Sequence, residues 1–70
     1  MDKQLADLTL EESWQLAIRR EREAQELYRA LAQKSTDSGM KALFESLLQQ
    51  EQGHEQRLQD EYDKAFRQEW

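Results

Sequence analysis

The sequence predicts an all-α fold, an antiparallel two-helix hairpin that pairs with a second copy to form a four-helix bundle. Three observations indicate this fold. The 70 residues contain no proline and many helix-forming residues, such as alanine, leucine, glutamate and glutamine. Apolar residues recur in steps of three and four along two segments, as on one face of a helix. One short polar stretch separates the segments, and so short a connection makes the helices antiparallel neighbours.

The first helix is expected over residues 10–34, after an N-terminal arm of residues 1–9 that is extended or frayed. Thr9 and Glu12 have the spacing of a capping box, in which each side chain accepts a hydrogen bond from the other residue's backbone N–H. The pattern of the helix stops at Lys34. Its apolar stripe comprises Leu10, Trp14, Ala17, Ile18, Ala24, Tyr28, Leu31 and Ala32.

The second helix is expected over residues 38–68, after a turn of residues 35–37. Asp37 is the expected N-cap, because aspartate at this position accepts a hydrogen bond from the first free N–H groups. Residues 10–70 therefore make a single hairpin domain. The second apolar stripe comprises Met40, Leu43, Phe44, Leu47, Leu48, Leu58, Tyr62 and Phe66.

Composition excludes several classes of protein. The net charge of −5 and the pI near 4.8 argue against a nucleic-acid partner. No apolar run is long enough to span a membrane, and the start MDKQLADLTL lacks the features of a signal peptide. With no cysteine, the chain has no disulfide, and we expect a cytoplasmic protein. A chain this short rarely builds a sufficient hydrophobic core. A metal or a partner chain must therefore add stability.

Polar residues interrupt both apolar stripes. Glu21 lies one heptad from Trp14 and from Tyr28, so it shares their face of the first helix. Glu51 and His54 lie three residues apart in the second stripe, and their side chains face the same side. Because glutamate is abundant here, Glu51-x-x-His54 alone is weak evidence for a metal site.

The hairpin register strengthens that evidence. Thr36, in the turn, is the midpoint of 21 and 51, so Glu21 and Glu51 meet at the same height. Two buried carboxylates repel each other and lose hydration, and a cation between them removes both costs. Alternatively, these polar residues lie at the edge of a metal-free helical interaction module. The same register pairs Tyr28 with Phe44, Trp14 with Leu58, and Leu10 with Tyr62.

A homodimer would complete the site. Two chains supply four glutamates and two histidines, the ligand inventory of di-iron four-helix bundles. Four carboxylates balance two divalent ions, and these oxygen and nitrogen donors suit Fe(II), Mn(II) or Zn(II) without selecting among them. A non-catalytic oligomer stabilised by one of these metals is therefore an alternative to an enzyme.

The sequence resembles the ferritin-like superfamily, specifically its half-size, two-helix members, the encapsulated ferritins and the diminutive ferritins. It is similar to rubrerythrin more loosely. The resemblance covers residues 10–62 and includes the 30-residue spacing between the two glutamates. Its motifs are Glu21-x-x-Ala24-x-x-x-Tyr28, the turn Ser35-Thr36-Asp37, and Glu51-x-x-His54.

The resemblance implies that Glu21, Glu51 and His54 are the metal-binding and catalytic residues of a ferroxidase. Such an enzyme oxidises Fe(II) to Fe(III) with O2 at a di-iron site shared across a homodimer. It also implies that dimers assemble further, often as a ring of five, which is a decamer. Tyr28 would lie in the surroundings of the metals, and Glu23 would serve metal entry.

Some positions depart from the family pattern. Gln50 stands before Glu51, where the family usually has a carboxylate, and Arg20 stands before Glu21. Encapsulated members continue into a third helix and a targeting tail, whereas this sequence ends at Trp70. The sequence therefore gives no clear signal for encapsulation.

Overall fold

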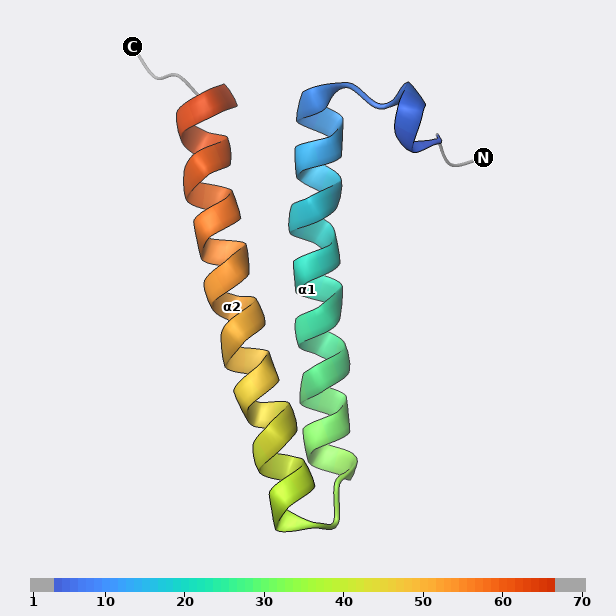
Figure 1. The fold of residues 1–70 in the computed structure, drawn as a ribbon, viewed down its shortest axis with the longest axis vertical. Coiled ribbons are helices and arrows are strands. Elements are labelled where there is room, and N and C mark those ends of the chain that lie inside the picture. The colour runs from blue at the N-terminus through green and yellow to red at the C-terminus, as the bar shows by residue number, and fades with distance from the viewer. Residues whose placement is uncertain (1–3, 67–70) are drawn as a thin grey trace.

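A computed structural model describes residues 4–66 as two long antiparallel helices and one short 3-10 helix (Figure 1). Helix α1 spans Leu10–Lys34 and helix α2 spans Ser38–Phe66, with residues 35–37 as the turn between them. The predicted all-α hairpin is confirmed. The expected end of the second helix, at residue 68, lies outside the described residues. The arm is not simply extended, because the 3-10 helix η1 occupies Leu5–Asp7.

Local hydrogen bonds explain where the helices begin. At the start of α1 the Glu12 N–H donates to Thr9 Oγ1 (3.0 Å) and the Thr9 N–H donates to Glu12 Oε1 (2.9 Å), which is the predicted capping box. At the start of α2 the Met40 N–H donates to Asp37 Oδ2 at 2.8 Å, so Asp37 caps this helix as predicted. These bonds satisfy N–H groups that have no partner within a helix.

Two contacts between the helices follow the predicted register. The rings of Tyr28 and Phe44 stack with their centroids 6.3 Å apart. The indole N–H of Trp14 donates to the Leu58 carbonyl oxygen at 3.0 Å. Both pairs are centred on the turn, so the helices run with equal rise from the turn to at least these positions.

The predicted pairing of Leu10 with Tyr62 is wrong. Leu10 is 70% exposed. The Tyr62 hydroxyl instead accepts a hydrogen bond from Gln15 Nε2 and donates one to Glu11 Oε1, both at 2.9 Å. The helices diverge toward the chain termini (Figure 1), so the register calculated for parallel axes no longer holds there.

The hairpin is a single layer of helices with almost no core. Its extents are 48 × 34 × 13 Å, and the shortest of them is about the diameter of one helix. Among residues 4–66 only Ile18 and Ala32 are buried apolar residues. Each helix can cover one side of the other, and the remaining apolar surface stays open.

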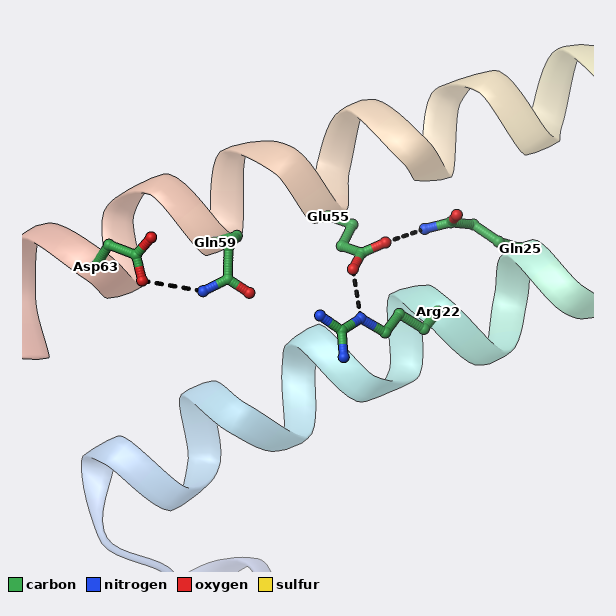
Figure 2. A network of polar contacts seen from close by, with 5 residues as sticks. All are labelled: Arg22, Gln25, Glu55, Gln59 and Asp63. Atoms are coloured by element: carbon green, nitrogen blue, oxygen red, sulfur yellow. Dashed lines mark hydrogen bonds and ion pairs between the residues drawn. The ribbon is translucent and has the colours of Figure 1, made fainter. Parts of the chain in front are cut away.

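On one face of the hairpin, Glu55 joins the two helices through polar contacts (Figure 2). Arg22 Nε donates to Glu55 Oε2, and Gln25 Nε2 donates to Glu55 Oε1 at 2.6 Å. A turn further along α2, Gln59 Nε2 donates to Asp63 Oδ1 at 3.1 Å. The hydrogen bond from Arg22, followed by that from Gln25, lowers the pKa of Glu55.

This lowered pKa predicts a pH-dependent contribution to stability. A carboxyl whose pKa is lower in the folded state stabilises above its unfolded pKa, and this stabilisation is lost as pH falls through the folded pKa. Glu55→Gln should therefore reduce the free energy of unfolding near pH 7, by less than about 1 kcal/mol because Arg22 is largely exposed. At a pH well below the folded-state pKa of Glu55 the difference from wild type should vanish, because the carboxyl is then protonated in both the folded and the unfolded protein.

Urea unfolding at both pH values, at one protein concentration, measures this effect. Glu45→Gln, at an exposed position of α2, is the matched control and should change neither value. A Glu55→Gln deficit that stayed the same at low pH would contradict the assignment.

Candidate metal centre

The structure brings Glu21, Glu51 and His54 together at mid-height of the hairpin. His54 Nδ1 lies 3.7 Å from Glu21 Oε2 and 3.7 Å from Glu51 Oε2. One donor atom from each of the three residues lies within 4.8 Å of the others. The two carboxylates are half-buried between the helices, whereas 53% of the His54 side chain is exposed.

One atom of this cluster lacks a hydrogen-bond partner. Glu21 Oε2 is buried and accepts no hydrogen bond. A buried carboxylate oxygen without a partner costs roughly 1–3 kcal/mol or more, and a nearby second carboxylate adds repulsion. His54 Nδ1, 3.7 Å from this oxygen, is too far away to form a hydrogen bond with it.

A divalent cation fits these donors. Ligand atoms that each lie about 2.1 Å from one ion are roughly 3–3.5 Å from each other, so small side-chain movements would suffice. Carboxylate oxygen and imidazole nitrogen are donors that suit Fe(II), Mn(II) and Zn(II). Three donors from one chain leave the coordination of such an ion incomplete.

A pocket opens beside the cluster, toward the chain termini. The Trp14 indole forms one wall, and its hydrogen bond to the Leu58 carbonyl sets its orientation. Sequence reasoning missed the two charged residues here. Arg57 and Glu61 follow His54 by three and seven positions, a spacing that places them on its side of α2. The pocket is lined by Trp14, Glu21, His54, Arg57, Leu58 and Glu61.

The other two predicted site residues lie elsewhere. Tyr28 is half-buried and packs against Phe44, so packing accounts for it, and its role near the metals stays a prediction. Glu23 is exposed and pairs with Arg20, with Arg20 Nη1 3.3 Å from Glu23 Oε2. It lines a separate groove, between α1 and the N-terminal segment that contains Leu5, away from the three donors.

The cluster lies on a face of the hairpin that carries much exposed apolar surface, which we call the site face. Residues seven positions apart share one side of a helix, so residues 10, 17, 24 and 31 form one row that flanks Glu21. The row of residues 40, 47 and 54 contains His54 and continues to Glu61. The exposed leucines and methionine on or beside these rows are Leu10 at 70%, Leu27 at 57%, Met40 at 51% and Leu43 at 55%.

Comparison with protein families gives a match to rubrerythrin over residues 2–62. This match covers all of α1, most of α2 and all three clustered residues, and it supports the ferritin-like resemblance of the sequence. It does not single out the encapsulated ferritins. Neither the curated proteins nor the solved structures returned a match. Within residues 4–66, neither helix has a stretch long and apolar enough to cross a membrane.

The unpartnered carboxylate predicts that the site reduces the stability of the metal-free protein. Glu21→Leu should raise the free energy of unfolding in the presence of chelator by about 1–3 kcal/mol, because it removes a buried, unsatisfied charge. It should also abolish any increase in melting temperature that a divalent metal gives wild type. Denaturant and thermal unfolding with chelator and with metal measure both effects.

Glu26→Leu, at an exposed position of the same helix, is the matched control. It should leave the response to metal intact. A Glu21→Leu protein that is less stable than wild type in chelator would show that Glu21 has a stabilising partner instead.

Proposed function

Because the chain belongs to the rubrerythrin family of ferritin-like proteins, we propose that it is a di-iron ferroxidase that oxidises Fe(II) to Fe(III) with dioxygen. The observation that carries the proposal is the half-buried group of Glu21, Glu51 and His54, with one carboxylate oxygen unpartnered. Two half-buried carboxylates that lie together beside one imidazole, with no hydrogen bond to the buried oxygen of Glu21, support a site that holds cations.

The proposed site is shared between two copies of the chain. One copy offers two carboxylates and one imidazole, and a two-fold dimer doubles this set around a common axis. The combined charge of −4 matches two divalent ions. Mn(II) or Zn(II) fit the same donors, and Fe(II) is proposed because of the family.

Each residue has a distinct role in this proposal. Glu21 and Glu51, from facing helices, would hold two cations close together, and His54 would supply a nitrogen donor from the edge. Fe(II), as the substrate, supplies one electron per ion to dioxygen. Trp14 and Leu58 would restrict water on the side of the pocket, and an apolar surrounding strengthens the attraction between carboxylates and cations.

The site face is the proposed dimer interface. Its exposed leucines and methionine form more apolar surface than a monomer of this size usually exposes, and the candidate ligands lie among them. A second hairpin laid on this face would bury both. The four helices would then enclose the core that a layer of two helices lacks.

We propose that the two hairpins pack antiparallel, with the turn of one against the open end of the other. Charge favours this arrangement. The turn half, residues 22–50, carries four basic and four acidic residues, whereas residues 4–20 and 52–66 carry four basic and seven acidic residues. Antiparallel packing keeps the open end of one hairpin, of charge −3, away from the open end of the other, which has the same charge.

The resemblance to half-size ferritins extends the proposal to a ring of five dimers in the cytoplasm. That arrangement is a decamer. An open ring would not enclose a mineral, so the proposed activity is iron oxidation.

Aerobic addition of Fe(II) tests the enzyme. Wild type should form Fe(III) faster than buffer alone, with two metals bound per dimer, whereas Glu51→Ala and His54→Ala should each fall to the rate in buffer. Stopped-flow absorbance and metal analysis measure rate and stoichiometry. Glu45→Ala, exposed on the same helix, should retain the wild-type rate.

Equal rates for wild type and the two site variants would rule out the ferroxidase. If metal still bound, the chain would be a metal-stabilised oligomer without catalysis. If neither metal content nor melting responded to chelator, it would be a helical interaction module.

The proposed orientation is tested by a distance between the two turns. The chain has no cysteine, so Thr36→Cys allows a spin label at the turn alone. Thr36 is 15 residues from Glu21 and from Glu51, so antiparallel hairpins would place the two labels about 45 Å apart, at about 1.5 Å per residue. Pulsed electron paramagnetic resonance measures this distance. A distance below roughly 20 Å, as in a parallel pair of the same helices, would overturn the orientation.

A further inference from the structure

The side of α2 that points away from α1 carries almost no charge. Its residues follow one another in steps of three and four, so they form a single row along the helix, and all of them are exposed. The corresponding outward row of α1, at residues 12, 16, 19, 23 and 26, contains four charged residues. In the row of α2 only the last residue is charged, although 36% of the whole chain is charged. This row, which we call the α2 edge, comprises Ala42, Ser46, Gln49, Gly53, Gln56 and Asp60.

Gly53 lies in the middle of the α2 edge, and the hairpin itself gives no reason for a glycine there. A Cβ at position 53 would meet no atom within 4 Å, and the glycine does not have a positive φ. Inside a helix a glycine is less favourable than an alanine. Glycine also allows another chain to approach the backbone closely. The reason for this glycine therefore lies outside a single hairpin.

The α2 edge stays open in the proposed dimer. The half-buried residues Phe44, Leu48 and Leu58 face α1 and lie on the opposite side of the helix. The site face contains a different row, at residues 40, 47 and 54, so a second hairpin on that face leaves the α2 edge in solvent. Depletion of charged residues is the compositional mark of the centre of a protein interface. The α2 edge has this mark.

We propose that the α2 edge joins two copies of the chain from different dimers, antiparallel and about a two-fold axis. The proposal rests on the dimer proposed above. A chain of charge −5 repels its copies, and two copies approach each other with least repulsion at a neutral edge. Glutamine side chains both donate and accept hydrogen bonds, so two copies of the same edge are complementary to each other.

One register suits both the glycine and the charges near the ends of the edge. In an antiparallel pair centred on position 51, Gln49 of one copy is level with Gly53 of the other, where the absence of a side chain leaves room for the amide. Lys41 of one copy and Asp60 of the other then lie within one residue of the same height, about 1.5 Å along the axis. The two-fold axis gives this contact twice. In a parallel pair each Asp60 would instead lie beside another Asp60.

Both charged groups are available for this contact. Within residues 4–66 the Lys41 ammonium forms no ion pair, and Asp60 accepts one hydrogen bond, at 3.0 Å, from Gln56 of its own helix. Both residues are exposed. Because exposed ion pairs contribute little, dimers should associate with each other less tightly than the two chains of one dimer.

Reversal of one charge, followed by rescue, tests the contact in the full chain. Wild type should form species larger than a dimer, and Asp60→Lys should weaken the association of dimers about ten-fold, because two attractive contacts become repulsive. Lys41→Asp together with Asp60→Lys should restore association. Positions 41 and 60 of one chain are about 28 Å apart along the helix, so the rescue can act only between chains. Sedimentation velocity over a range of protein concentrations measures these sizes.

Two further variants test the place and the register of the contact. Glu26→Lys reverses an exposed charge on α1 and should leave the association of dimers as in wild type. Gly53→Gln fills the space opposite Gln49 and should weaken the association. It should also raise the melting temperature of the separated dimer, because glutamine is the better helix former and a Cβ there meets no atom of the hairpin.

The α2 edge is overturned if wild type forms nothing larger than a dimer, or if Asp60→Lys or Gly53→Gln leaves the association unchanged. It is also overturned if the double variant does not regain association, or if Glu26→Lys weakens it as much.

These outcomes are distinct from failure of the proposed function. Asp60 lies away from the three candidate ligands, so separated Asp60→Lys dimers should oxidise Fe(II) at the wild-type rate. Wild-type dimers that oxidise Fe(II) but do not associate would overturn the α2 edge alone. Association that follows the expected pattern without Fe(II) oxidation would overturn the ferroxidase alone.

Discussion

The facing carboxylates of Glu21 and Glu51 are the constraint on which the rest of this structure depends. Each stands where an apolar stripe would otherwise continue, and one oxygen of Glu21 is buried without a partner. Elsewhere the features of the hairpin agree with one another, because caps, helix propensity and aromatic contacts all favour the same two helices. A local conflict within an otherwise consistent sequence is the mark of a functional site, since selection for folding alone would remove it.

Because the hairpin is only one layer of helices thick, the facing carboxylates have a second consequence. A single layer of helices cannot surround a metal with protein, and residues 4–66 bury only Ile18 and Ala32 as apolar residues. The site face, which no other part of the hairpin covers, is also the face on which a bound metal would lack further ligands. In the proposed dimer, association and metal binding would therefore stabilise one and the same folded state, and each would strengthen the other. Assembly, folding and chemistry of such a protein cannot be separated into independent steps.

Sequence reasoning succeeded where the signals are local or lie close to the turn. Capping spacings identified Thr9 and Asp37, and the heptads with a register centred on Thr36 brought Glu21 opposite Glu51. The predicted register was wrong at Tyr62, because the helix axes diverge at the open end, where large aromatic side chains lie. Counting residues from the turn assumes parallel axes and cannot detect this divergence. The short helix η1 has no periodicity to detect. Arg57 and Glu61 were missed because charged residues outside a stripe look like ordinary solvent-exposed positions.

Glu51 and Glu55 show that the residue opposite on α1 decides the role of a glutamate on α2 more than the residue type does. They lie one turn apart on α2, and their side chains are similarly buried, at 19% and 23% exposed. Glu55 meets Arg22 and Gln25 and is satisfied, whereas Glu51 lies with Glu21 and His54. Since Glu21 and Arg22 are consecutive, rotation of α1 by one residue would place a guanidinium opposite Glu51 and replace the site with an ion pair. The turn of residues 35–37 sets that register, so its length determines whether the mid-hairpin carboxylates attract a cation or are neutralised by the protein itself.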